Sequence, residues 1–357
     1  MAPENDAPSK GRIAVSLVLF MLGFVVAAAA IHPWLRDPIR LHADLRSEKL
    51  ELLDGWKGGV YSAAFGSSHV NDGFDPRAFD DELSSMQRRT PSINLGIEGG
   101  SQTEQRALAL EFLRHFSTSS LPDQRPCVLL LELNAGTNFR GDYLVHPRSI
   151  NIYDWSTVQF ALTMSDRSLG ARRLLGRDIY AFAAMAMHYA NVGMLSSFIL
   201  KPPINQQIMQ EETENDRRGL HALQGVENDF APVSNAAEAP RSPVPVDQKL
   251  VPGNYRLIDE LAAASNDPNL HFAYVVAPFY TDLNSYPRFP DSIQTAHGVE
   301  PILSLDRPDI YPELFTPKYW HDAAHLNEQG AALASRLLAD QLRAWYQDHH
   351  RNLNCGG

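Results

Sequence analysis

The chain has 357 residues, 44% of them hydrophobic and 20% charged, which is ordinary for a globular protein with a substantial core. Its 31 basic and 42 acidic residues give a formal net charge of −11, which argues against non-specific nucleic-acid binding because such binding requires a basic surface. Cys127 lies in an apolar run and Cys355 in a polar tail, so we expect a buried thiol and no disulfide between them, and no residues have metal-site spacing.

The N-terminal segment has the composition of a membrane-spanning helix. Residues 13–31 carry no charge, and their number is close to the ~20 that a helix needs to cross a bilayer. Two basic residues precede this run, and because basic residues stay in the cytoplasm, residues 1–12 should form a cytoplasmic head. A cleaved signal peptide is the alternative, since Ala28 and Ala30 offer a small-x-small cleavage site. We favour an uncleaved anchor because the run is long for a signal peptide; either way the remaining chain is exported.

Residues 32–57 are predicted to form a charged amphipathic stalk helix, and a catalytic domain is expected over residues 58–350. In this domain short apolar runs, typical of strands, alternate with helical patterns. Strands are expected at 60–65, 92–96, 127–133, 271–277 and 301–305, and helices at 76–88, 103–116, 255–264 and 328–345. The alternation predicts a three-layer α/β/α sandwich, of the flavodoxin-like kind, with a mostly parallel, five-stranded sheet.

A long insertion, at about residues 140–252, separates the third predicted strand from the fourth. Within it, residues 179–200 carry no formal charge and could span a membrane. A second span would place the last two strands on the other side of the membrane from the first three, which would split the sheet. We therefore favour a helix that packs on the domain, with the option that it touches the bilayer. Residues 210–248 are polar and rich in Pro, Glu and Asn, which is typical of a mobile loop.

Two serines, Ser67 and Ser68, follow Gly66 directly after the first predicted strand. A serine nucleophile needs a base within hydrogen-bonding reach and a group that orients this base. Near the C-terminus, Asp322 precedes His325 by three residues, just before the last predicted helix. That spacing can bring the carboxylate to one imidazole nitrogen and leave the other free to accept a serine proton. The alternative for this pair alone is a helix N-cap and a surface histidine.

The G-S-S and D-x-x-H segments together resemble the SGNH (GDSL-like) hydrolase superfamily. In that family the nucleophilic serine follows the first strand in a G-D-S motif, and the base and its aspartate lie in a D-x-x-H motif near the C-terminus. The resemblance makes Ser68 the nucleophile, His325 the general base and Asp322 its orienter. Ser67 stands where the family usually has aspartate, a departure that a subgroup with a G-S-S motif shares.

The family's other two motifs supply oxyanion donors. The resemblance places one donor at Gly99, five residues after Asn94 in the segment N-L-G-I-E-G-G-S, although such a segment is also an ordinary turn before a helix. The third motif, G-x-N-D after the third strand, has a weaker counterpart. Asn138 has the Gly-x-Asn spacing but falls late and lacks the aspartate, whereas Asn134 lies closer to the strand and lacks the glycine. We prefer Asn138 and keep Asn134 as its alternative; His69 is a further candidate to line the pocket.

The N-terminal anchor, the opening G-S-S-H-V-x-x-G-F-D-P and the closing H-L-N-x-x-G look like the membrane-anchored SGNH proteins of alginate acetylation and lipoteichoic-acid D-alanylation. The resemblance implies a serine ester hydrolase or O-acyltransferase that acts on an acylated polysaccharide or another exported polymer through an acyl-serine, without cofactor or metal. It also implies a single-pass protein of the bacterial inner membrane with a periplasmic domain, and a membrane-bound O-acyltransferase as partner. The alternative is a non-catalytic scaffold of the same fold, which the displaced third motif and the missing aspartate suggest.

Overall fold

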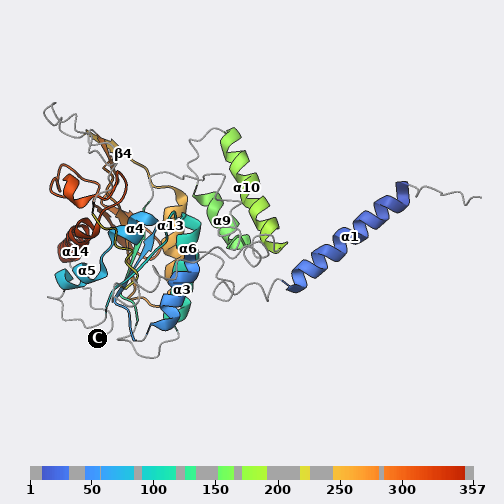
Figure 1. The fold of residues 1–357 in the computed structure, drawn as a ribbon, viewed down its shortest axis with the longest axis horizontal. Helices are drawn as coiled ribbons and strands as arrows, with labels where there is room; N and C mark the ends of the chain where they lie inside the picture. Colours follow the sequence, from blue (N-terminus) through green and yellow to red (C-terminus); the bar gives the residue numbers. More distant parts are fainter. Residues whose placement is uncertain are drawn as a thin grey trace, which may run out of the picture.

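A computed structural model of the chain has a mixed α/β fold with an apolar N-terminal helix, α1 (Lys10–Ile31), that lies apart from the other elements (Figure 1). Among the helices in the described part of the chain, α1 is the one long and apolar enough to cross a membrane. This finding agrees with the predicted anchor in length and composition. The structure describes residues 10–31, 45–56, 58–83, 91–117, 125–133, 152–164, 171–190, 218–225, 244–280 and 285–349.

The central sheet has six strands in the order β2-β1-β3-β5-β8-β7. Five run parallel and correspond to the five predicted strands: β1 (Ser62–Gly66), β2 (Ile93–Gly96), β3 (Val128–Glu132), β5 (His271–Val276) and β8 (Val299–Ser304). The predicted count of five is wrong because β7 (Ser292–Gln294) adds an antiparallel edge strand. Only Ile293 is buried in this short strand, so its sequence lacks an apolar run. Outside this sheet, β4 (Val244–Asp247) pairs with β6 (Ser285–Arg288).

Four helices of the domain begin within three residues of their predicted starts: α5 (Pro76–Leu83), α6 (Gln102–Ser117), α13 (Pro252–Ser265) and α14 (Glu328–Asp348). The elements α4 (Ser68–Gly73), α9 (Trp155–Thr163) and the 3₁₀ turn η4 (Pro317–Tyr319) were not predicted. Within the predicted stalk, α3 (Leu45–Gly55) contacts α6 and buries Leu53, so this part of the segment belongs to the folded body.

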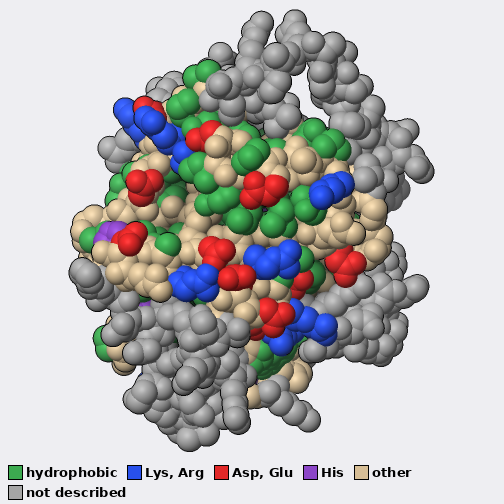
Figure 2. All heavy atoms as spheres, turned by 90° about the vertical axis from the view of Figure 1, so that its left-hand side faces the viewer, with side chains coloured by type: hydrophobic (Ala, Val, Ile, Leu, Met, Phe, Trp, Pro, Cys, Tyr) green, Lys and Arg blue, Asp and Glu red, His purple; other side chains and the backbone are tan. Residues whose placement is uncertain are grey.

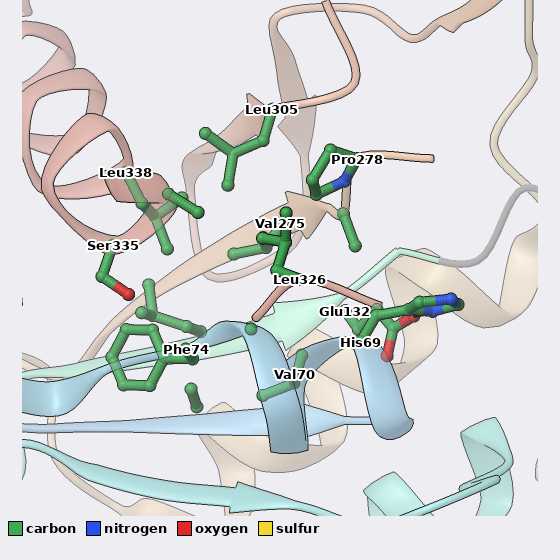
Figure 3. A pocket seen from close by; sticks show the side chains of 15 residues that line it. His69, Val70, Phe74, Glu132, Val275, Pro278, Leu305, Leu326, Ser335 and Leu338 are labelled. Carbon is green, nitrogen blue, oxygen red and sulfur yellow. Dashed lines mark hydrogen bonds and ion pairs between the residues drawn. The ribbon is translucent and has the colours of Figure 1, made fainter. Parts of the chain in front are cut away.

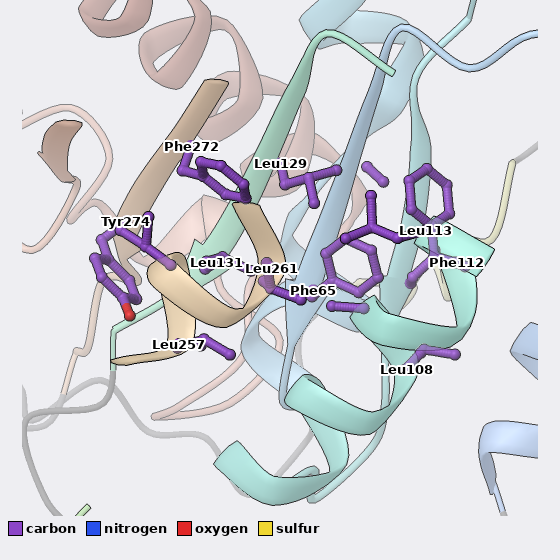
Figure 4. Packing of buried hydrophobic residues seen from close by; sticks show 14 of the residues in the cluster. Phe65, Leu108, Phe112, Leu113, Leu129, Leu131, Leu257, Leu261, Phe272 and Tyr274 are labelled. Carbon is purple, nitrogen blue, oxygen red and sulfur yellow. The ribbon is translucent and has the colours of Figure 1, made fainter. Parts of the chain in front are cut away.

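Alternate residues of the strands enter two separate hydrophobic clusters, because successive side chains of a strand point to opposite faces of the sheet. In β1, Ala63 and Phe65 belong to one cluster and Ala64 to the other. The first cluster joins the sheet to α6 and α13, and Figure 4 shows the packing of Phe65, Leu108, Phe112, Leu113, Leu129, Leu131, Leu257, Leu261, Phe272 and Tyr274. The second joins the sheet to α5 and α14. The strands are therefore held rigidly, and their carboxyl ends form one edge.

An ion pair supplements the apolar packing between α5 and α14. Arg343 of α14 donates hydrogen bonds to the backbone carbonyl of Glu82 at 2.7 Å and to its carboxylate at 3.1 Å. Figure 2 shows one face of the molecule, on which acidic and basic side chains are interspersed rather than gathered by sign. Surface pairs of this kind contribute little stability individually.

The short helix α4 follows β1 at the carboxyl edge and is held by a buried side chain of β2. The Asn94 amide donates to the carbonyls of Val70 and Phe74, both at 2.7 Å, and of Asn71 at 3.1 Å. The carbonyls at the end of a helix have few partners within the helix, so Asn94 adds hydrogen bonds from outside. Its own carbonyl accepts a hydrogen bond from the Gly96 backbone N at 2.9 Å. This arrangement fixes α4 against the end of β2.

Replacing Gly96 with alanine should destabilise the domain. The new Cβ would collide with the backbone N and Cα of Asn71 in α4, which cannot turn aside as a side chain can. We expect the free energy of unfolding to fall by about 3 kcal/mol, as measured by chemical denaturation. Gly176→Ala is the matched control, since a Cβ at Gly176 meets no atom within 4 Å and alanine favours a helix by up to about 1 kcal/mol. Equal stability of both variants would contradict the close approach.

The described part of the insertion contains α10 (Ala171–Tyr189), which packs against α9. Ala181 and Ala184 are buried in a small cluster with residues of α9, whereas Ile179 and Phe182 are exposed. Among the described helices, α10 is not long and apolar enough to cross a membrane. Residues 191–200 of the predicted uncharged run, and most of the predicted mobile loop, lie outside the described residues.

Cys127, fully buried just before β3, forms a disulfide bond. The expectation of a free thiol is therefore wrong; Cys355, the other cysteine of the sequence, lies outside the described residues. Burial in an apolar run is common to free and bonded cysteines, so the sequence pattern could not separate them. Disulfides persist in oxidising compartments, which fits an exported domain.

Candidate active site

Ser68, His325 and Asp322 meet at the carboxyl edge of the sheet. The Ser68 hydroxyl Oγ lies 2.9 Å from His325 Nε2. On the other side of the ring, Nδ1 lies 2.8 Å and 3.0 Å from the two carboxylate oxygens of Asp322. An ionised carboxylate only accepts hydrogen bonds, so Nδ1 carries the proton and Nε2 can accept the serine proton. The arrangement is that of nucleophile, base and orienting acid.

The Asp322 carboxylate is held in place by its own turn. It accepts hydrogen bonds from the backbone N of Ala324 and of His325, both at 2.7 Å. Burial raises the pKa of Asp322, but the His325 ring and these backbone groups outweigh it and hold the pKa below its usual value. Asp322 is therefore ionised at neutral pH. The N-cap of α14 is instead Asn327, which accepts from the Gly330 N at 3.1 Å, so the N-cap interpretation of Asp322 is wrong.

The nucleophile candidate is the first residue of α4. Ser67 is the N-cap of this helix and has an extended backbone, and its side chain accepts a hydrogen bond from the His69 backbone N at 3.3 Å. The two serines thus differ in their partners, because Ser67 caps the helix while Ser68 faces the His325 ring. Among the described residues, the backbone N–H of Ser68 donates to no acceptor, so it is available to an anion in the site.

Glu132, the last residue of β3, holds the turn formed by Gly66, Ser67 and Ser68, which we call the nucleophile turn. Its side chain is 2% exposed and accepts hydrogen bonds from the Ser67 backbone N, from Ser67 Oγ at 3.0 Å and from His69 Nδ1 at 3.1 Å. Burial raises the pKa of Glu132, but His69 and the Ser67 hydrogen bonds outweigh it and hold the pKa below its usual value. Glu132 was not predicted as a site residue, although a lone acidic residue in a buried apolar strand indicates a required partner.

Two glycines shape the loops beside the nucleophile. A Cβ at Gly66 would collide with the Glu132 carboxylate, so only glycine allows this close approach. Gly99 has a φ of +57°, a left-handed conformation that favours glycine. It lies in the loop after β2, where the Ile97 N donates to the Gly66 carbonyl at 2.9 Å. This bond ties the loop to the nucleophile turn; the role of Gly99 as an oxyanion donor stays a prediction.

His69 lines a small cavity near the triad, although Ser68, Asp322 and His325 do not line it; a role of His69 in a substrate pocket stays a prediction. Its ring is nearly parallel to that of His325, with centroids 5.7 Å apart, and meets Phe279 edge-on at 4.5 Å. The cavity has a volume of about 30 Å³, and Figure 3 shows His69 and Glu132 together at one end and Ser335 at the other. The remaining walls are apolar. A space of this size holds about one water molecule or methyl group.

A further buried carboxyl group, that of Asp306, lies next to the backbone of Phe279. Asp306 is 6% exposed and accepts a hydrogen bond from the Phe279 backbone N at 3.4 Å. Burial raises the pKa of Asp306 to about 7, although this hydrogen bond and the charge of His69 oppose the rise. Between pH 3.8 and pH 7, Asp306 therefore keeps its proton in the folded protein, whereas the same group in the unfolded chain, with its ordinary pKa of 3.8, has lost it. This group stabilises the fold fully below that value, and the contribution is lost as the pH rises through 7.

Asp306→Asn should remove this pH dependence, because an amide cannot ionise. Between pH 5 and pH 8, we expect the wild type to lose roughly 2–3 kcal/mol of unfolding free energy relative to the variant. Urea denaturation of both proteins at several pH values measures the difference in their unfolding free energies. The contributions of groups that titrate equally in both proteins cancel in this difference. Parallel stability curves over this range would contradict the raised pKa.

The comparisons with known proteins give no relative: no protein-family model matches the chain, and no curated protein matches it either. The resemblance to the SGNH superfamily therefore stays a proposal, supported by motifs and geometry. Asn138 and its alternative Asn134 lie outside the described residues. In the described segments, no group of three or more His, Cys, Asp or Glu side chains could hold a metal ion.

Proposed function

We propose that the protein is a membrane-anchored serine ester hydrolase or O-acyltransferase that forms an acyl-serine at Ser68. One observation carries the proposal: Ser68 and His325, 257 positions apart, lie in hydrogen-bonding contact, and His325 in turn contacts Asp322. A partly exposed serine hydroxyl, a correctly protonated imidazole and an ionised carboxylate are the parts that acyl transfer requires.

In the first half of the reaction, Ser68 Oγ attacks the ester carbonyl carbon while His325 Nε2 takes the hydroxyl proton. Asp322 stabilises the resulting imidazolium. The tetrahedral intermediate then collapses, and His325 returns the proton to the departing alcohol oxygen. In the second half, water or a hydroxyl acceptor gives its proton to His325 and attacks the acyl-serine, which restores the Ser68 hydroxyl.

The oxyanion of the tetrahedral intermediate needs preorganised donors. The Ser68 backbone N–H, which has no acceptor in the described part of the chain, is the first donor that we propose. The Gly99 N–H is the second, and the side chain of Asn138, or of Asn134, the third. The hydrogen bond from Ile97 to Gly66 supports this assignment of Gly99, because it keeps the loop beside the nucleophile turn.

We place the chain in the SGNH superfamily, with its three-layer sandwich, and propose a single-pass protein of the bacterial inner membrane with a periplasmic domain. The parallel sheet, the apolar helix α1 and the disulfide at Cys127 support this placement. The substrate class is an acylated polysaccharide or another exported ester polymer. A membrane-bound O-acyltransferase is the partner that would supply or share the acyl group.

Ester turnover by the full-length chain in detergent tests the proposal. With p-nitrophenyl acetate, we expect a burst of about one p-nitrophenolate per chain followed by slower turnover, because the acyl-serine accumulates when deacylation is slow. His325→Ala should lose both phases. Absence of burst and turnover in a wild-type chain that is folded by circular dichroism would contradict the enzyme and favour a non-catalytic scaffold.

A further inference from the structure

A second histidine–carboxylate pair lies beside the triad, and the hydrolytic steps do not use it. His69 Nδ1 lies 3.1 Å from Glu132 Oε1, and because an ionised carboxylate only accepts hydrogen bonds, Nδ1 carries a proton and donates it to this bond. Among the described residues, no group hydrogen-bonds His69 Nε2, although the side chain is only 17% exposed. The ring is thus oriented by a buried anion, and its Nε2 has no hydrogen-bond partner in the described part of the chain.

The position of the His69 ring indicates which part of a bound ester it would contact. A general base such as His325 lies next to the oxygen that leaves or enters, since it exchanges a proton with that oxygen. The His69 ring runs nearly parallel to the His325 ring, at 24° and 5.7 Å. His69 therefore borders the place of the departing or attacking alcohol, whereas the Ser68 backbone N–H marks the oxyanion side.

Phe279 adds an apolar surface beside the position of the departing or attacking alcohol. Its ring meets His69 edge-on at 4.5 Å, and Phe279 is 39% exposed, although it lies three residues after the buried end of β5. The Phe279 backbone is anchored by the hydrogen bond to Asp306. An aromatic face with a fixed backbone, next to an imidazole nitrogen that can hydrogen-bond a ligand, suits a molecule with an apolar C–H face and hydroxyl groups, which is the chemistry of a sugar ring.

We propose that His69 and Phe279 form the acceptor subsite, which binds a sugar hydroxyl for attack on the acyl-serine; this inference rests on the proposed function. Phe279 covers the C–H face of the sugar, and His69 Nε2 forms a hydrogen bond with one of its hydroxyl groups. The attacking oxygen forms the new ester bond as the bond from Ser68 Oγ to the acyl carbon breaks. Its proton passes to His325 and then to Ser68, and His69 takes no part in this proton transfer.

The partition of the acetyl-enzyme between water and a sugar tests this subsite. The full-length chain in detergent receives p-nitrophenyl acetate and methyl glucoside, and mass spectrometry measures acetylated glucoside against free acetate. His69→Asn keeps an amide donor for Glu132 and removes the group at Nε2. We expect the ratio of transfer to hydrolysis in this variant to fall roughly tenfold, which is the effect of one lost hydrogen bond. Its burst rate should fall by a smaller factor. His69→Gln, with an amide near the Nε2 position, should recover part of the ratio.

Two further variants make the result specific. Phe279→Ala should lower the same ratio through a higher KM for the glucoside. His297→Asn is the matched control, because His297 Nε2 contacts the Leu270 carbonyl at 2.9 Å, at the other end of β5, and its ratio should equal that of the wild type. If His69→Asn fails to fold, Phe279→Ala decides.

Three results would overturn the inference and leave the proposed function intact. The first is a wild-type burst that yields acetate and no acetylated glucoside. The second is an unchanged ratio in folded His69→Asn and in Phe279→Ala. The third is an equal loss of burst rate and transfer in His69→Asn, since that would make His69 a positioning residue for the nucleophile turn. A folded wild type without any burst would instead contradict the proposed function itself.

Discussion

Ser68→Ala should lower kcat/KM for p-nitrophenyl acetate by about 10⁴-fold or more, because the variant has no atom that can carry the acyl group. The remaining histidine and aspartate could at most assist water. We expect the thermal midpoint to change little, since Ser68 is partly exposed and, within the described residues, its hydroxyl bonds only the His325 ring. Initial rates and thermal denaturation of the same preparation measure both quantities.

Ser67→Ala is the matched control for the nucleophile. Ser67 caps α4 and donates to Glu132, so its loss should cost about 1 kcal/mol of stability. The nucleophile remains, and we expect kcat/KM to fall by no more than about tenfold, the effect of one hydrogen bond. The reverse ranking of the two variants would assign the acyl group to Ser67 and contradict the proposed mechanism.

Glu132→Gln should reduce both stability and activity. The glutamine amide has a donor where the carboxylate only accepts, so it cannot accept from the Ser67 backbone, the Ser67 hydroxyl and His69 as Glu132 does. We expect a loss of about 2–4 kcal/mol in the free energy of unfolding. We also expect a decrease of roughly 100-fold in kcat/KM, because small misplacements of a nucleophile are costly. Urea denaturation and initial rates provide the two measurements.

Glu260→Gln distinguishes the two effects of the Glu132 substitution. Glu260 accepts from the buried guanidinium of Arg106 at 2.5 Å, between α13 and α6 and away from the triad. Its loss should lower stability without lowering kcat/KM. A Glu132→Gln protein with the wild-type rate would show that Ser67 and His69 keep their places without the anion.

Much of the fold follows from burial, which the sequence records directly. The five parallel strands were predicted because a strand buried on both faces is an almost continuous apolar run, as in β3. The edge strand β7 was missed because it buries one residue of three. The helix α4 was missed because it has six residues and no helical period of apolar positions; its carbonyls are satisfied by Asn94, a tertiary contact that no local pattern contains.

The candidate site was likewise only partly predictable from the sequence. The contact between Asp322 and His325 is local, so a spacing of three residues sufficed to predict it. The contact of His325 with Ser68 spans 257 positions, and it was proposed only through the resemblance of two motifs in order. Glu132 and Phe279 lie in no motif. They join the site because β3 ends beside β1, and because the chain after β5 turns over His69.

Covalent labelling of the full-length chain with a fluorophosphonate, followed by mass spectrometry of its peptides, tests the central claim most directly. The reagent reacts with a serine whose hydroxyl is activated by a neighbouring base. The proposed mechanism predicts one adduct per chain, on Ser68, and no adduct in folded His325→Ala. An adduct on another residue, or an unlabelled wild-type chain that is correctly folded, would contradict it.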